Sequence, residues 1–112
     1  MLHYKNNQPY IEGVAVDDII KTHVTPFYVY SQKAISKTYK ELQNALNAEI
    51  FYAVKANSNQ AIIKFICSLG AGADVVSVGE LKRALSAGVE SQKIIFEGVG
   101  KSLEDILFAI EQ

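Results

Sequence analysis

The sequence places one lysine where its amine could react with a carbonyl group. Lys55 ends the apolar run Phe51–Val54, which predicts a buried strand. Alternation along that strand puts Phe51, Ala53 and Lys55 on one face. A lysine in partly apolar surroundings loses its proton more easily, and a neutral amine condenses with aldehydes to form Schiff bases. The alternative is an ordinary surface lysine at a strand end, and periodicity alone leaves both open.

Two glycine-rich stretches are similar to phosphate-binding loops but lack essential parts. The stretch GAGADV, at 70–75, has no third glycine and precedes its strand, whereas a dinucleotide-binding fingerprint follows a strand. The stretch GVGKS, at 98–102, has Ile95 where a P-loop requires glycine, and Glu97 would repel phosphate. Neither stretch therefore predicts a nucleotide site.

A regular alternation of strands and helices positions these residues. Strand-like runs occupy 49–54, 73–77 and 93–97. Helical patterns follow at 59–69, at 78–87 and from Ser102 to the end of the chain. This rhythm predicts right-handed crossovers, a parallel sheet and an α/β fold. Such folds place their chemistry at the carboxyl ends of the strands, where Lys55 stands.

The first part of the chain is less regular. A helix is predicted at 31–47, with apolar residues along one face. The segment TPFYVYS, at 25–31, is strand-like, and Pro26 delays its start because proline cannot donate to a ladder. Residues 1–24 are predicted to be irregular and polar as far as GVAVDDII.

Two helix starts carry side chains suited to free backbone N–H groups. Ser77 and Glu80 stand three residues apart before the helix at 78–87, the arrangement of a capping box. Ser102 and Asp105 repeat it at the next helix, where the acid also faces the positive end of the helix dipole.

Composition excludes several classes of protein. The 112 residues are 49% hydrophobic and 21% charged, with a formal net charge of -1, which suits a soluble chain with one modest core. That charge gives no reason to expect nucleic acid or a membrane surface as a partner. A single cysteine, Cys67, cannot form an internal disulfide, so we expect a buried, inert thiol and a cytoplasmic protein. His3 and His23 lack partners at metal-ligand spacing, and we expect no metal.

The stretch around Lys55 resembles the cofactor-attachment signature of the fold-type-III pyridoxal-phosphate decarboxylases, which include the diaminopimelate, ornithine and arginine enzymes. The segments 25–31, 72–81 and 94–102 also resemble this family. The motifs DVVSVGEL and GVGKS favour its diaminopimelate branch. The signature residues are Tyr52, Ala53, Lys55, Ala56, Asn57, Ile62, Ile63, Ile66 and Gly70.

The resemblance implies roles for individual residues. Lys55 would be the catalytic residue that holds pyridoxal 5'-phosphate, and Asp74 would lie close to that cofactor. Ala53, Asn57 and Glu80 would lie in the surrounding shell. The residues themselves also permit a strand-start charge for Asp74 and a helix cap for Glu80.

The resemblance further implies an architecture. Residues 31–112 would form the first three βα units of a (β/α)8 barrel of the alanine-racemase type, and residues 1–30 would include a strand of the family's second, β-rich domain. A complete barrel needs about 250 residues, so we expect this chain to be a fragment and to be inactive alone. The family builds its active sites across a homodimer.

The reaction implied is decarboxylation of meso-2,6-diaminopimelate to L-lysine and carbon dioxide. The alternatives are decarboxylation of another amino acid or polyamine precursor (ornithine, arginine or carboxynorspermidine) and a non-catalytic or regulatory pyridoxal-phosphate-binding homologue. A small flavodoxin-like module is disfavoured because KANSNQ, at 55–60, is not glycine-rich.

Overall fold

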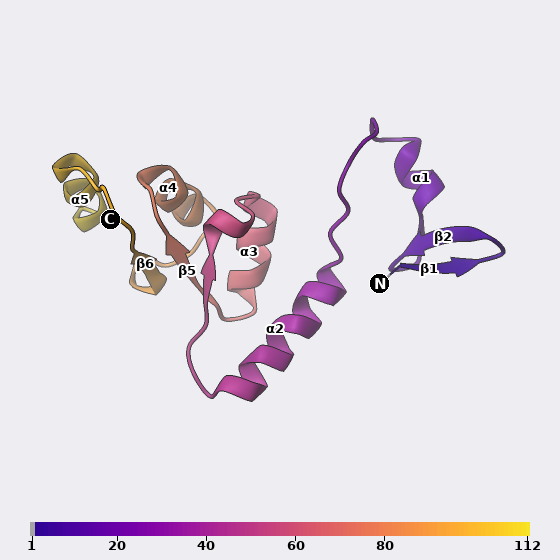
Figure 1. Cartoon of the computed structure of the whole chain (residues 1–112), viewed down its shortest axis with the longest axis horizontal. Coiled ribbons are helices and arrows are strands. Elements are labelled where there is room, and N and C mark those ends of the chain that lie inside the picture. Colours follow the sequence, from indigo (N-terminus) through magenta and orange to yellow (C-terminus); the bar gives the residue numbers. More distant parts are fainter. Residues whose placement is uncertain (1) are drawn as a thin grey trace. The chain divides into compact units, whose positions relative to one another are not determined.

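The computed structural model describes residues 2–112, and the chain forms two compact units that divide between Lys40 and Glu41. Each unit has its own three-stranded sheet, with helix α2 (Gln32–Leu46) spanning the division (Figure 1). The first unit is antiparallel and the second is parallel.

The sheet of the first unit is a meander of β1 (Leu2–Lys5), β2 (Gln8–Ile11) and β3 (Val14–Ala15), followed by the short helix α1 (Val16–Ile20). Two-residue turns join the strands, at Asn6–Asn7 and at Glu12–Gly13, and all four turn residues have positive φ. Paired positive φ angles are typical of type I′ hairpin turns, which favour asparagine and glycine. The prediction that residues 1–24 are irregular was therefore wrong, and the Asn-Asn and Glu-Gly pairs were the missed signal.

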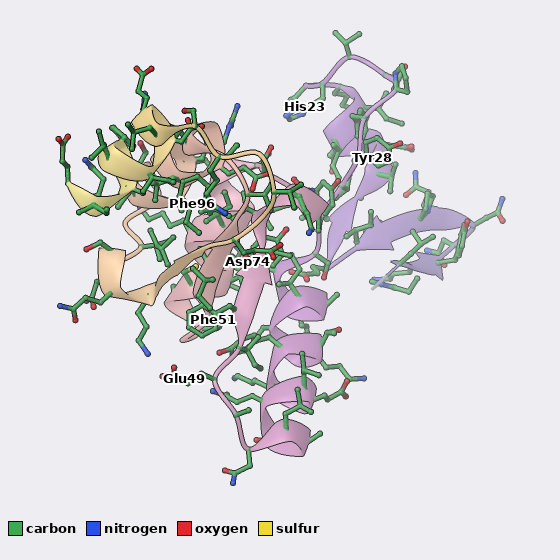
Figure 2. All side chains as sticks on the ribbon, turned by 60° about the vertical axis from the view of Figure 1, so that its left-hand side comes forward. His23, Tyr28, Glu49, Phe51, Asp74 and Phe96 are labelled. Atoms are coloured by element: carbon green, nitrogen blue, oxygen red, sulfur yellow. The ribbon has the colours of Figure 1, made fainter. Side chains whose placement is uncertain are left out.

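The predicted strand at 25–31 is also wrong, because this segment is neither helix nor strand. A strand needs a neighbour for its backbone groups, and β1, β2 and β3 pair among themselves. Tyr28 in this segment is 89% exposed (Figure 2). The segment ends at Ser31, whose hydroxyl caps α2 by accepting from the Ala34 N–H.

The second unit repeats strand and helix three times. Its strands are β4 (Phe51–Ala53), β5 (Gly72–Val75) and β6 (Ile94–Phe96), parallel and in that spatial order. The helices are α3 (Gln60–Ser68), α4 (Val78–Ser86) and α5 (Leu103–Ile110). Two 3-10 turns complete the unit, η1 (Val54–Ala56) after β4 and η2 (Ser91–Lys93) before β6. The predicted parallel sheet and its three helices are confirmed, with each strand shorter than expected.

Helices α3 and α4 cover one face of this sheet. Ala73 and Val75 of β5 point into the resulting core and are inaccessible to solvent, as are Ile63 of α3 and Ala84 of α4. Tyr52, Ile94 and Phe96 pack against the same core from the flanking strands. Because successive side chains of a strand alternate between faces, the remaining strand residues must lie on the opposite face.

The predicted helix caps are confirmed in one case and altered in the other. Ser102 and Asp105 form a complete capping box on α5. Ser77 caps α4 by accepting from the Glu80 N–H, but the Glu80 carboxylate accepts from the N–H of Val76 rather than from that of Ser77. The acid therefore ties the end of β5 to the start of α4.

Candidate functional site

The face of the parallel sheet that lies opposite the helices carries the residues to which the sequence points. The register pairs Phe51 with Gly72, Ala53 with Asp74, and Asp74 with Ile95. Side chains paired in this way share a face, so these five positions form one surface, which we call the open face. Figure 2 labels two of them, Phe51 near the start of β4 and Asp74 in β5.

Close packing at the amino end of the open face depends on a glycine. A Cβ added to Gly72 would stand 2.4 Å from Cδ1 of Phe51 and 2.6 Å from the carbonyl oxygen of Lys93. The phenylalanine ring therefore occupies the space that a side chain at position 72 would need. Because Gly72 and Ala53 are small, the larger side chains of Phe51 and Asp74 occupy most of this face.

The expectation that Lys55 continues the strand was wrong, because Lys55 lies in the turn η1. Its side chain is largely exposed rather than in partly apolar surroundings. Val54 anchors this turn because it is completely buried in the core. The hydroxyl of Tyr52 donates to the carbonyl oxygen of Asn57 at 3.0 Å, which closes the turn from the helix side. The Asn57 carboxamide oxygen then accepts from the Asn59 N–H, leading directly into α3. Asn57, which was predicted to lie beside the site, therefore also stabilises the turn that carries Lys55.

The charged partner of Lys55 is Glu97, the acid that would repel phosphate from the GVGKS stretch. The lysine Nζ lies 3.6 Å from Oε1 of Glu97, and the two side chains are 59% and 52% exposed. The Glu97 N–H donates to the carbonyl oxygen of Val75, extending the β5–β6 ladder by one residue. Alternation from Ile95 to Glu97 was the signal that could have placed this acid on the open face.

Asp74 brings an unsatisfied acceptor to the same face. Its Oδ1 atom is buried and has no hydrogen-bond partner among the described residues. A buried acceptor without a donor is costly, and such atoms are uncommon in folded proteins. The open face thus carries a carboxylate oxygen that lacks a donor, and the strand ends beside it carry the amine of Lys55 and the carboxylate of Glu97.

The other predicted residues are placed as follows. Ala53 is half-buried and pairs with Asp74 across the β4–β5 ladder. Glu80 is engaged with the Val76 N–H, and this bond accounts for its position without a ligand. Cys67, which was expected to be buried, is only partly buried and lies at the opposite end of the unit. Burial still raises the pKa of its thiol, and its Sγ is 3.8 Å from the carbonyl oxygen of Gly72.

Two kinds of feature are absent from the described residues, 2–112. No group of three or more histidine, cysteine, aspartate or glutamate side chains is arranged to hold a metal ion. Among the same residues no helix has both the length and the apolar character needed to cross a membrane.

Comparisons with known proteins agree on one family. The model of the family described as "Pyridoxal-dependent decarboxylase, pyridoxal binding domain" matches residues 32–112. A curated diaminopimelate decarboxylase of Pseudomonas fluorescens is 43% identical over 97% of this chain and 27% of its own length. That of Neisseria meningitidis serogroup B is 47% identical over 90% of this chain and 25% of its own length. The chain thus spans about a quarter of the length of the curated relatives it matches.

Solved structures give the same result. A protein from Aquifex aeolicus superposes with a TM-score of 0.92 at 40% identity, covering 98% of this chain and 28% of that chain. Diaminopimelate decarboxylase from Helicobacter pylori, complexed with L-lysine, gives a TM-score of 0.77 at 42% identity, covering 86% and 25%. An ornithine decarboxylase from Entamoeba histolytica, 20% identical with a TM-score of 0.78, shares the fold. This chain belongs to the family of pyridoxal-dependent decarboxylases, through its pyridoxal binding domain.

Proposed function

We propose that this chain is the cofactor-binding part of an enzyme that decarboxylates meso-2,6-diaminopimelate to L-lysine and carbon dioxide. The observation that carries the proposal is the position of Lys55, on a braced turn at the carboxyl end of β4 beside the open face. The substrate is proposed from the curated relatives, which are diaminopimelate decarboxylases at 38–48% identity.

The residues of the open face fit pyridoxal 5'-phosphate. Lys55 supplies a primary amine for its aldehyde, and Asp74 supplies a buried carboxylate oxygen that lacks a donor. The small side chain of Ala53, which pairs with Asp74 across the β4–β5 ladder, takes up little room beside that carboxylate. When bound, the cofactor supplies an electron sink for the pair of electrons left as carbon dioxide departs.

The chain's own residues then have separate tasks. Lys55 would hold the cofactor covalently and would be free to carry a proton at Nζ once the substrate amine has replaced it. Asp74 would accept a hydrogen bond from a donor group on the bound molecules. Asn57, through its bond from Tyr52, would fix the turn on which the amine stands, and Glu80 would fix the loop after β5.

The finer architecture is part of the same proposal. Residues 31–112 would contain the first three βα units of a (β/α)8 barrel, with the open face toward its axis. Residues 1–30 would belong with a second, β-rich domain. A homodimer in the cytoplasm, where the lone cysteine would stay reduced, is part of the same proposal.

Other amino-acid substrates are the main alternative. A lysine decarboxylase from Selenomonas ruminantium is 30% identical over 86% of this chain, with a TM-score of 0.78. That identity is lower than the 42% of the Helicobacter pylori diaminopimelate enzyme. Parallel assays of carbon dioxide release from diaminopimelate, lysine, ornithine, arginine and carboxynorspermidine by the full-length enzyme would rank these substrates, and no release from any of them would favour a non-catalytic homologue.

The cofactor proposal is tested on the chain itself. Pyridoxal phosphate is added, the adduct is reduced with borohydride, and its position is mapped by mass spectrometry. We expect the adduct on Lys55, and we expect Lys55→Ala to abolish it while Lys64→Ala, at an exposed helical lysine, leaves it unchanged. An adduct spread over other lysines contradicts the proposal.

We also expect the 112-residue chain to release no carbon dioxide from diaminopimelate.

A further inference from the structure

We propose that Glu97 is a positioning residue that holds the side chain of Lys55 over the carboxyl end of β5 until an aldehyde ligand arrives. The inference deepens the proposed function and rests on it, since it assigns Glu97 a part in loading the cofactor. It concerns a contact within the described part of the second unit, between residues 42 positions apart in the sequence (97 minus 55).

The topology makes this contact informative. Lys55 follows β4, Glu97 follows β6, and β5 lies between these strands. Their side chains therefore meet beyond the carboxyl end of the middle strand, where alternation from Ile95 places Glu97 on the same side of the sheet as Asp74. Both backbones are fixed, Lys55 by the buried neighbour Val54 and Glu97 by its bond to Val75. The ion pair thus sets where the flexible lysine chain points.

A second ion pair at the other end of the sheet provides a comparison. Glu49, before β4, and Lys93, before β6, approach to 2.7 Å across the amino end of β5. That pair is hydrogen-bonded, and it lowers the pKa of Glu49 and raises that of Lys93. The Lys55–Glu97 pair, at 3.6 Å, lies beyond a normal hydrogen bond. The ion pair at the amino end of the sheet is therefore hydrogen-bonded, whereas the pair at the carboxyl end, which includes Lys55, is looser.

Other cations at this end of the unit are engaged elsewhere. The Lys101 ammonium donates to the carbonyl oxygen of Gly98 at 2.6 Å, and the Arg83 guanidinium donates to that of Ser58 at 3.4 Å. Asp74 adds a negative charge to the same face, and the buried position of its Oδ1 separates it from solvent. Glu97 is thus the exposed acid that the structure pairs with Lys55.

The chemistry requires the pair to open. The ammonium group of Lys55 must release a proton to water before its nitrogen can form a bond with the aldehyde carbon, and the carbonyl oxygen then leaves as water. While the pair is formed, the Glu97 carboxylate lies against Nζ of Lys55, so the two groups must separate before a small aldehyde that makes no other contact can reach that nitrogen. A ligand with its own binding contacts would displace the pair and find the amine already aimed.

The test uses formaldehyde and cyanoborohydride in limiting amounts on the 112-residue chain, with methylation of each lysine quantified by mass spectrometry. The readout is the rate at Lys55 divided by the rate at Lys64, which lies on the exposed side of α3. Glu97→Gln should raise this ratio about 1.4- to 5-fold, the range for an exposed ion pair. Glu97→Asp should give a smaller rise, because it keeps the charge on a shorter arm.

Glu49→Gln is the matched control, since it removes the same charge from the other ion pair and should raise the relative rate at Lys93 but not at Lys55. On the unaltered chain, 1 M salt should raise the Lys55 ratio toward that of Glu97→Gln, because salt screens exposed charges. This arm needs no variant. An unchanged Lys55 ratio in Glu97→Gln, or no response to salt, overturns the proposal. Neither readout requires pyridoxal phosphate to bind, so a failed borohydride experiment would refute the proposed function separately.

Discussion

The two faces of the parallel sheet are built from alternate residues of the same three short strands, and they differ in kind. The face under α3 and α4 carries Ala73 and Val75, both fully buried among apolar neighbours. The open face carries Asp74, with a buried oxygen that lacks a donor, and leads to Lys55 and Glu97 at its edge. One face therefore supplies the buried apolar contacts that stabilise the fold, and the other carries polar groups that lack full hydrogen-bond partners. This division is expected where a fold supports a reactive site.

The largest expected effect contrasts an isoleucine from each side. Ile63 of α3 is inaccessible to solvent, whereas Ile95 on the open face is 46% exposed. Ile63→Ala should lower the free energy of unfolding by about 2–5 kcal/mol, because it leaves a cavity in the core. Ile95→Ala should cost at most about 1 kcal/mol. Urea denaturation of the two variants measures the difference, and equal losses would erase the distinction between the faces.

A glycine substitution tests how tightly the open face is packed at its amino end. Gly72→Ala should destabilise by about 1–3 kcal/mol, since the new Cβ meets the Phe51 ring and the Lys93 carbonyl group. Gly79→Ala is the control, because a Cβ there meets only the Ser77 hydroxyl at 3.7 Å and the helix gains about 0.5–1 kcal/mol. The melting temperatures of the two variants should move in opposite directions. A neutral Gly72→Ala would mean that both the Phe51 ring and the Lys93 backbone move aside readily.

Removing the unsatisfied acid should strengthen the fold and weaken the site. Asp74→Ala eliminates a buried oxygen without a donor, so we expect a gain of about 1 kcal/mol in the free energy of unfolding. The yield of borohydride-trapped cofactor on Lys55 should fall in the same variant. Urea denaturation and mass mapping check the two effects, and a loss of stability would show that Asp74 has a structural partner in solution.

The smallest expected effect concerns a helix end away from both faces. The backbone N–H of Ser102, and then its hydroxyl, hold the pKa of the Asp105 carboxyl below its ordinary value. A lowered pKa in the folded chain means that this contribution is present above the ordinary value of about 3.9 and is lost as the pH falls through the folded value. Circular dichroism should show α5 weakening in that acid range, and Asp105→Asn should remove this pH dependence.

The βα part of the fold could be predicted from sequence because its signals are local. Strands such as Ile94–Phe96 are short apolar runs, and Ser102 with Asp105 marks a helix start within four residues. The position of Lys55 at a strand end follows from the same patterns. The pairing of Lys55 with Glu97 could not be predicted in this way, because the contact depends on the order of three strands, which no short segment encodes.

The N-terminal unit illustrates the opposite case. Its hairpin turns depend on positive φ at Asn6 and Asn7, a signal of two residues that the polar surroundings obscured. The strand expected at 25–31 failed for a different reason, since its run of aromatic and branched residues suits a ladder that the described chain does not provide. A pattern can indicate which residues would pair, but pairing itself requires a second segment.

The bond from the Tyr52 hydroxyl to the Asn57 carbonyl has a consequence for sequence change. It fixes how many residues separate the end of β4 from the start of α3, because a strand residue is hydrogen-bonded to the far side of the turn. Inserting or deleting a single residue there would break this hydrogen bond or change the direction of the Lys55 side chain. Length variation, which surface loops usually absorb without harm, should be intolerable in these few positions.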